Sequence, residues 1–167
     1  GLAVRSQANR MCVLRQLCEY LARTDPPAFL PEPVRAPSSR GAHRAYIFAH
    51  EQVGALLSAA STLPPPGSLR PETYRTLFGL LYSTGIRIGE AFGLNIEHFF
   101  PEERRLYIAE GKFRKSRWIV LSASTAEALS QYVIRRMTKE PNGPEAPLLL
   151  NERRQRLCHP TVRKGFM

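Results

Sequence analysis

Two basic side chains of this sequence are placed as chemistry on a phosphate group would require. Arg87 lies two residues after Gly85, where one helix is expected to end and another to begin. Lys112 follows 25 residues later, in a basic turn between two expected strands. Arginine offers a planar fork of donors and lysine a compact charge, so together they can grip one phosphate from two sides.

An amphipathic helix is expected to position Arg87. Residues 71–84 begin with a proline, which the first turn of a helix favours, and they carry apolar residues at helical spacing. Gly85 suits the position that closes such a helix, because glycine adopts the left-handed conformation at little cost. A short helix over residues 88–93 would then begin directly after Arg87.

Lys112 lies in a hairpin that is expected to pair residues 105–109 with residues 117–121. Six basic residues gather around this hairpin: Arg104, Arg105, Lys112, Arg114, Lys115 and Arg117. A second basic cluster lies near the C-terminus: Arg153, Arg154, Arg156, Arg163 and Lys164. Such clusters favour contacts with backbone phosphates, whose contribution to affinity depends steeply on salt and little on sequence. A solvated charged surface is the alternative interpretation of both.

The remaining pattern is mostly helical. Residues 5–23 and 50–61 have helical periodicity, and a capping box from Ser124 to Glu127 is expected to open a helix ending near residue 137. Five prolines interrupt residues 24–42, which predicts an extended linker. We therefore predict an α+β fold in which helices surround a small antiparallel hairpin, with domain boundaries at 1–23, 24–42 and 43–167.

The charge balance favours a polyanionic partner. Lys and Arg number 24 against 14 Asp and Glu, which gives a net charge of +10. Nucleic acid is the first candidate and an acidic membrane surface the second. The sequence has no apolar run long enough to cross a bilayer, and its three cysteines lack metal-ligand spacing. Its first six residues form no long apolar stretch, so we expect no secretory signal. We expect a cytoplasmic protein with reduced thiols that needs no metal or cofactor.

The order of these parts resembles the tyrosine recombinase (phage integrase) family. The resemblance rests on the proline-rich linker, on Tyr46-Ile47-Phe48 after it, on residues 82–90 around Arg87, and on the hairpin lysine. It implies the front half of a catalytic domain over residues 43–167. It also implies that residues 1–23 are the last helix of a DNA-clasping domain.

The resemblance further implies a chemistry. In that family a tyrosine attacks a DNA phosphodiester, and a 5′-hydroxyl later resolves the 3′-phosphotyrosine intermediate. By resemblance, Arg87 is the first of two phosphate-binding arginines and Lys112 is the general acid. Lys115 is the alternative acid, although phosphate contact suits it better. Glu90 is expected to orient the Arg87 guanidinium from the same helix face. Double-stranded DNA is the implied partner, and family members form tetramers on two DNA sites.

Other parts of the family pattern are not found. His159 and Arg163 are spaced four apart, whereas the family's second arginine motif is His-x-x-Arg, and none of the six tyrosines is assigned as the nucleophile. We therefore expect a recombinase fragment that binds DNA phosphates and does not cleave DNA alone. One alternative is a non-catalytic DNA-binding protein or relic that keeps the phosphate-binding residues. Another is a basic domain that binds RNA or a different acidic partner.

Overall fold

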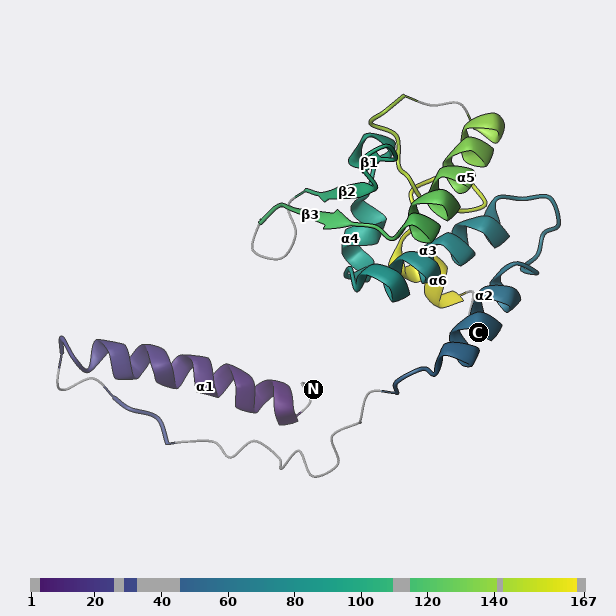
Figure 1. Cartoon of the computed structure of the whole chain (residues 1–167). Helices are drawn as coiled ribbons and strands as arrows, with labels where there is room; N and C mark the ends of the chain where they lie inside the picture. Colours follow the sequence, from purple (N-terminus) through teal and green to yellow (C-terminus); the bar gives the residue numbers. More distant parts are fainter. Residues whose placement is uncertain (1–3, 26–28, 33–45, 110–114, 141–142, 165–167) are drawn as a thin grey trace. The chain divides into compact units, whose positions relative to one another are not determined.

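The computed structural model describes residues 4–25, 29–32, 46–109, 115–140 and 143–164 (Figure 1). The chain divides into two compact units, Gly1–Ile47 and Phe48–Met167. No helix within the described ranges combines the length and apolar character that crossing a membrane requires.

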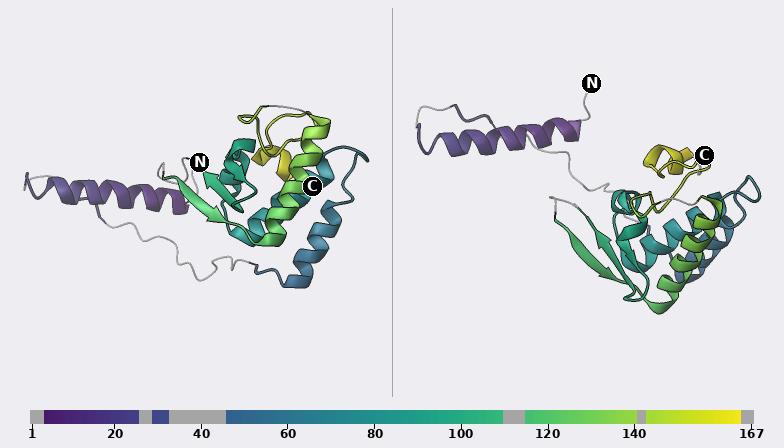
Figure 2. Two further views of the ribbon diagram at one scale, coloured as in Figure 1. Left: turned by 45° about the horizontal axis from the view of Figure 1, so that its top comes forward. Right: turned by 90° about the horizontal axis from the view of Figure 1, so that it is seen from above.

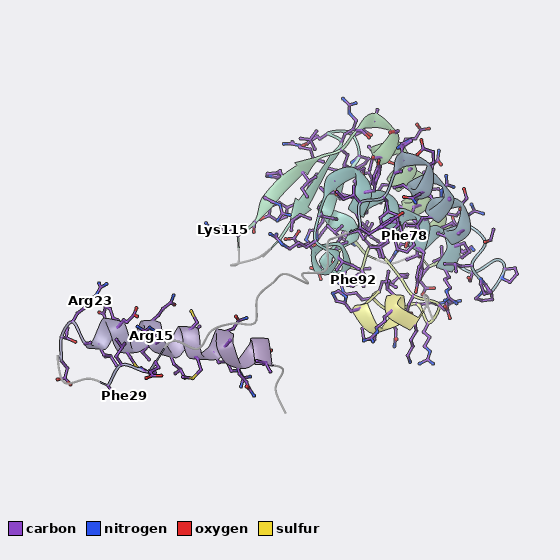
Figure 3. All side chains as sticks on the ribbon, turned by 90° about the horizontal axis from the view of Figure 1, so that it is seen from below. Arg15, Arg23, Phe29, Phe78, Phe92 and Lys115 are labelled. Atoms are coloured by element: carbon purple, nitrogen blue, oxygen red, sulfur yellow. The ribbon has the colours of Figure 1, made fainter. Side chains whose placement is uncertain are left out.

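The described part of the first unit contains the helix α1 (Val4–Leu21), where residues 5–23 were predicted to be helical. Arg15, which is labelled in Figure 3, lies on this helix. Its Nη1 donates a 2.6 Å hydrogen bond to the carbonyl oxygen of Pro31 in the segment that follows the helix. Leu14 and Leu17 remain exposed. Within this unit α1 therefore buries little of its apolar surface.

The second unit is built on α3 (Arg70–Thr84), which packs against three other helices. These are α2 (His50–Ala60), α4 (Ile88–Gly93) and α5 (Ala123–Lys139). A short helix, α6 (His159–Lys164), follows near the end of the described chain. Leu77, Leu129 and Leu148 are almost fully buried where these segments meet. Each such leucine contributes about 2 kcal/mol of burial free energy, so the core holds the helices in place.

A three-stranded antiparallel sheet lies beside the helices, and its two four-residue strands project from them (Figures 1 and 2). The strands are β1 (Phe99–Phe100), β2 (Arg105–Ile108) and β3 (Arg117–Val120), in that order, and the short helix η2 (Ile96–His98) precedes them. The mostly helical α+β fold and the predicted hairpin are confirmed. The sequence missed β1, because two residues are too few to show an alternating pattern.

The register of β2 and β3 decides which side chains face the helices. Leu106 pairs with Ile119 and Ile108 pairs with Arg117. Because side chains alternate along a strand, Arg117 shares the inner face with the buried Leu106 and Ile108. Trp118 lies on the outer face, where its side chain is half exposed. One arginine of the hairpin is thus directed toward the helical part of the unit.

The start of α5 corrects a prediction. Ser122 is the N-cap residue, and its Oγ accepts a hydrogen bond from the backbone N–H of Thr125 at 3.2 Å. Ser124 already lies inside the helix, so the predicted capping box from Ser124 to Glu127 is wrong. The backbone of Ser122 is extended, with φ −62° and ψ 156°, as an N-cap residue requires, and the chain bends at that earlier serine.

Candidate phosphate-binding site

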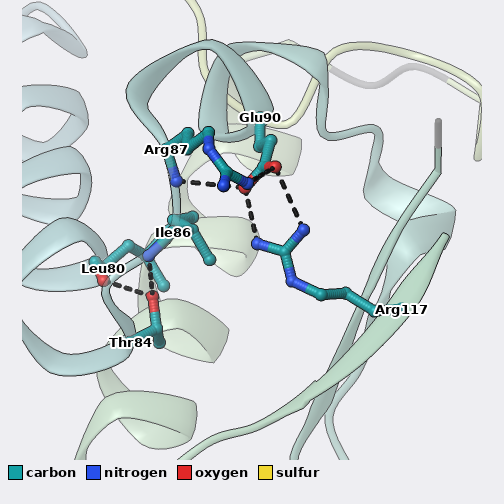
Figure 4. A network of polar contacts seen from close by, with 6 residues as sticks. All are labelled: Leu80, Thr84, Ile86, Arg87, Glu90 and Arg117. Carbon is teal, nitrogen blue, oxygen red and sulfur yellow. Dashed lines mark hydrogen bonds and ion pairs between the residues drawn. The ribbon is translucent and has the colours of Figure 1, made fainter. Parts of the chain in front are cut away.

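The end of α3 sets the position of Arg87. Thr84 Oγ1 donates to the carbonyl oxygen of Leu80 at 2.6 Å and accepts from the N–H of Ile86 at 3.3 Å (Figure 4). Gly85 closes the helix in the left-handed conformation, with φ 65° and ψ 18°. The chain therefore turns sharply after α3 and presents Arg87 as the N-cap residue of α4.

Glu90 lies one turn into α4 and reaches back to Arg87. Its Oε2 accepts from the Arg87 backbone N–H at 3.0 Å, and its Oε1 accepts from Arg87 Nη1 at 2.9 Å. The first contact satisfies one of the backbone donors that a helix leaves unpaired at its start. The Glu90 side chain is only 7% exposed, whereas that of Arg87 is 58% exposed. A nearly buried carboxylate therefore holds an arginine that remains open to solvent.

Arg117 contacts the same carboxylate from the sheet. Its Nη1 donates to Glu90 Oε1 at 3.0 Å and its Nη2 to Glu90 Oε2 at 2.7 Å (Figure 4). This is the two-pronged geometry in which a guanidinium and a carboxylate match best. Sequence reasoning grouped Arg117 with the DNA-contacting residues and missed its contact with Glu90. The alternation of side chains along the predicted strand, which places Arg117 on the inner face of the sheet, could have indicated that Arg117 points toward the helices.

The two arginines determine the charge state of Glu90. Hydrogen bonds from Arg117 are the largest cause that lowers the Glu90 pKa to about 2, against burial, which raises it. Hydrogen bonds from the backbone and guanidinium of Arg87 lower it further. At neutral pH the site therefore holds one carboxylate and two guanidinium groups. The excess of one positive charge at an open surface suits an anion such as a phosphate.

The other basic residues of the hairpin lie apart from this network. Arg105 is on the opposite face of the sheet from Arg117, paired with Glu103 and lying over the ring of Trp118 at 5.0 Å from its centre. Arg104 is exposed in the turn between β1 and β2, where its backbone has φ 50°. The structure thus separates three arginines that the sequence placed in one cluster.

Of the two lysines in the hairpin, Lys115 is within the described residues and Lys112 is not. Lys115 is exposed just before β3, at the outer part of the hairpin (Figure 3). Lys112 and Arg114 lie outside the described residues. The geometry therefore bears on Arg87, Glu90 and Arg117, and the roles expected for the turn residues stay predictions.

Arg156, from the second basic cluster, is bound to the opposite end of α4. Its Nη1 donates to the carbonyl oxygens of Phe92 at 2.8 Å and Leu94 at 3.1 Å. Its Nη2 donates to Asn95 Oδ1 at 2.7 Å. The Leu94 carbonyl oxygen also accepts from the Leu148 N–H at 2.8 Å, whereas the Phe92 carbonyl is one of those that a helix end leaves without a partner in the helix, so Arg156 acts as a cap supplied from a distant segment.

A cavity of about 440 Å³ lies in the same unit, beside α2, α3 and α5. Leu57, Gly79, Tyr82 and Gln131 are among its lining residues, and Arg87, Glu90 and Arg117 are not. In the part of the chain that the structure describes, no three His, Cys, Asp or Glu side chains are grouped closely enough to hold a metal ion. The two arginines of the charged site are exposed to solvent instead, by 58% for Arg87 and 40% for Arg117.

Comparison with known proteins gives the family. The model of the phage integrase family matches residues 47–167, which include every residue of the site. The chain therefore belongs to the phage integrase family. It is 32% identical over 166 residues to y4rE of Sinorhizobium fredii, a candidate integrase/recombinase, covering 99% of this chain and 54% of that protein. It is 29% identical over 146 residues to tyrosine recombinase XerC of Neisseria meningitidis, covering 83% of this chain and 44% of that protein.

Solved structures give the same fold. The XerH recombinase bound to a palindromic difH substrate, in a post-cleavage complex, has a TM-score of 0.64 and 22% identity. That match covers 99% of this chain and 47% of XerH. The XerA recombinase has a TM-score of 0.59 and 20% identity, covering 98% of this chain and 52% of that one. The chain spans about half the length of the relatives that it matches.

Proposed function

We propose that this chain supplies the first phosphate-binding part of a site-specific DNA recombinase. The observation that carries the proposal is an exposed arginine, Arg87, held in place by the nearly buried and ionised carboxylate of Glu90. Preorganised guanidinium groups stabilise the charge that develops on non-bridging phosphate oxygens during phosphoryl transfer. The XerH structures contain DNA substrates, which supports double-stranded DNA as the partner.

The proposed reaction is the transfer of a DNA phosphoryl group to a tyrosine. The tyrosine hydroxyl gives its proton to a base that we do not assign, its oxygen forms a bond with phosphorus, and the bond from phosphorus to the 5′-oxygen breaks. Arg87 neutralises charge on the phosphate, and Lys112 gives a proton to the departing 5′-oxygen. Lys115 is the alternative donor. The reverse step, attack by a 5′-hydroxyl on the phosphotyrosine, returns that proton and rejoins the DNA.

We assign none of the tyrosines in this chain as the attacking group. Two of them are buried in the core of the second unit. Tyr74 donates to the carbonyl oxygen of Thr161 at 3.0 Å, and Tyr132 donates to that of Leu148 at 3.2 Å. Burial raises the pKa of both hydroxyls, which makes them poorer nucleophiles. The proposal therefore leaves the attacking tyrosine and the second phosphate-binding arginine unassigned.

Arg104, Arg105, Arg114, Lys115 and Arg117 are the residues that we expected to contact backbone phosphates. The first four of these supply general attraction for DNA. By resemblance, a complete protein carrying this domain would act in the cytoplasm as a tetramer on two DNA sites. Proteins of this family that bind DNA without cleaving it are the alternative, and the same phosphate site would serve them.

The test is the affinity of the chain for a short DNA duplex, measured by fluorescence anisotropy from 50 to 300 mM salt. Arg87→Ala is expected to weaken binding about five- to tenfold and to reduce the slope of log affinity against log salt by about 0.9, as loss of one phosphate contact requires. Arg153→Ala, which removes an exposed positive charge from the segment before α6, is the matched control.

Equal losses for Arg87→Ala and Arg153→Ala would leave only general electrostatic attraction and would contradict the proposal. A DNA duplex that carries a nick near the family's cleavage position provides a second readout. We expect the chain to form no covalent complex with it, and a trapped complex through any of the six tyrosines would refute our assignment.

A further inference from the structure

Arg117 differs from Arg87 in how its guanidinium is used. Both terminal nitrogens of Arg117 bind Glu90, at 3.0 and 2.7 Å, and the side chain is 40% exposed. Arg87 uses one terminal nitrogen on Glu90, at 2.9 Å, and is 58% exposed. Of the two, Arg87 has more of its donors directed elsewhere.

We propose that Arg117 is a positioning residue that fixes Glu90 and, through it, the guanidinium of Arg87. The proposal deepens the proposed function and rests on it, because it concerns the phosphate-binding residue Arg87. It replaces the expectation from sequence that Arg117 acts by touching DNA.

The geometry of the carboxylate supports this role. An ionised carboxylate has about four acceptor sites, and the hydrogen bonds from Arg117 and Arg87 occupy four directions on Glu90. The two bonds from Arg117 define the plane of the carboxylate, because a planar fork fits it in one orientation. The remaining sites then point at the backbone N–H and guanidinium of Arg87. Without Arg117, rotation of the carboxylate would release Arg87 to several rotamers.

The fold supports the same conclusion. Arg117 is on the inner face of β3, in register with Ile108, whereas Glu90 projects from α4. The ion pair therefore ties the strand that leaves the basic turn to the helix that begins at Arg87. A phosphate could take the place of Glu90 on the two-pronged face of Arg117 only if that fork left a nearly buried carboxylate, which would then lose its strongest partners.

The experiment compares Arg117→Gln and Arg117→Lys with Lys115→Gln, which removes an exposed charge two residues earlier. Each change is made alone and together with Arg87→Ala, and affinity for duplex DNA is measured. We expect Arg117→Gln to weaken binding about fivefold in the native background and less than about twofold in the Arg87→Ala background. Lys115→Gln is expected to cause the same loss in both backgrounds.

The lysine variant separates position from charge. Lysine keeps the positive charge but lacks the fork, so Arg117→Lys is expected to behave like Arg117→Gln. Native affinity for Arg117→Lys, with equal losses for Arg117→Gln in both backgrounds, would show a direct phosphate contact and overturn the proposal.

Nuclear magnetic resonance of the chain without DNA gives an independent readout. In the Arg117 variants, the carboxyl carbon of Glu90 is expected to titrate at a higher pKa, and the Arg87 Nε–H to show a lower order parameter. An unchanged order parameter would overturn the positioning role even where DNA binding falls. If Arg87→Ala binds DNA as tightly as the native chain, the proposed function fails, and this measurement still decides the role of Arg117.

Discussion

The two ends of α4 bind arginines in different ways. At its start, Arg87 and Arg117 share the ionised carboxylate of Glu90. At its end, Arg156 binds two backbone carbonyl oxygens and the side-chain oxygen of Asn95. Arg117 and Arg156 come from clusters that the sequence alone marks as basic surface, whereas Arg87 stands outside both. Their acceptors, rather than their charge, distinguish their roles.

The acceptors at the two ends of α4 also differ in whether they leave a positive charge available to bind an anion. The Glu90 carboxylate cancels one of two positive charges and directs Arg87 toward solvent, so the start of α4 is suited to an incoming anion. Neutral oxygens hold Arg156 instead, and its charge lies at the negative end of the helix dipole, where it stabilises the helix. One end of a six-residue helix is therefore suited to binding, and the other holds the fold together.

The largest predicted effect on stability is at the end of α4. Arg156→Ala removes three hydrogen bonds and leaves the carbonyl oxygens of Phe92 and Leu94 without this partner, so we expect it to lower the free energy of unfolding by about 2–3 kcal/mol. Urea unfolding followed by the fluorescence of Trp118, the single tryptophan of the chain, measures the change in the second unit.

Arg153→Ala is the matched control, because it removes an exposed arginine from the same segment. Its effect on the free energy of unfolding is expected to stay below about 0.5 kcal/mol. The comparison of the two helix ends fails if both variants are equally stable. It also fails if Arg156→Ala, once folded, loses as much DNA affinity as Arg87→Ala.

The next effect is at the start of α4 and depends on pH. The Glu90 pKa is lowered from 4.5 to about 2 in the folded chain, so its ionised form stabilises the fold. That stabilisation is complete above pH 4.5 and is lost as the pH falls toward 2. Glu90→Gln removes it, and we expect a loss of about 2 kcal/mol at pH 7, reduced from the full linkage value because both arginines are partly exposed.

The difference between native chain and Glu90→Gln in urea unfolding, measured at pH 7, 4 and 2.5, is expected to shrink steadily, with the pH values chosen to bracket the linkage range. Glu102→Gln, which changes an exposed carboxylate in the turn after β1, is expected to differ from the native chain by less than about 0.5 kcal/mol throughout. A constant difference for Glu90→Gln would mean that the carboxylate stabilises the fold by packing rather than by charge.

Local patterns in the sequence were sufficient to predict how α3 ends and where Arg87 and Glu90 lie at the start of α4. The proline, the apolar spacing and Gly85 predicted α3 and its end, because helix capping depends on a few adjacent residues. The position of Arg87 relative to Glu90 followed from helix geometry alone. The same local reasoning chose the wrong serine for the start of α5, since Ser122 and Ser124 are both good caps and the path of the chain after β3 decides between them.

Long-range contacts were beyond the sequence. Arg105 and Arg117 both border the predicted hairpin, and only the register of β2 and β3 shows that they lie on opposite faces of the sheet. Arg156 reaches a helix end that precedes it by 62 residues or more, and no spacing rule connects the two. The residues of one basic cluster in a sequence can therefore have different roles, and only the acceptor of each side chain shows which role it has.

The smallest predicted effect tests how the chain reaches the start of α4. Gly85 has a left-handed backbone, whereas Gly79 lies inside α3, and added Cβ atoms at both would meet no neighbour within 4 Å. Conformation alone then separates the two. Gly85→Ala is expected to lower the free energy of unfolding by about 1 kcal/mol, and Gly79→Ala to raise it by about 0.5 kcal/mol, in the same urea measurement.

Because Gly85 precedes Arg87 by two residues, Gly85→Ala is also expected to weaken duplex DNA binding about twofold, while Gly79→Ala leaves it unchanged. Equal DNA affinity for both variants would mean that Glu90 and Arg117 hold Arg87 without help from the turn.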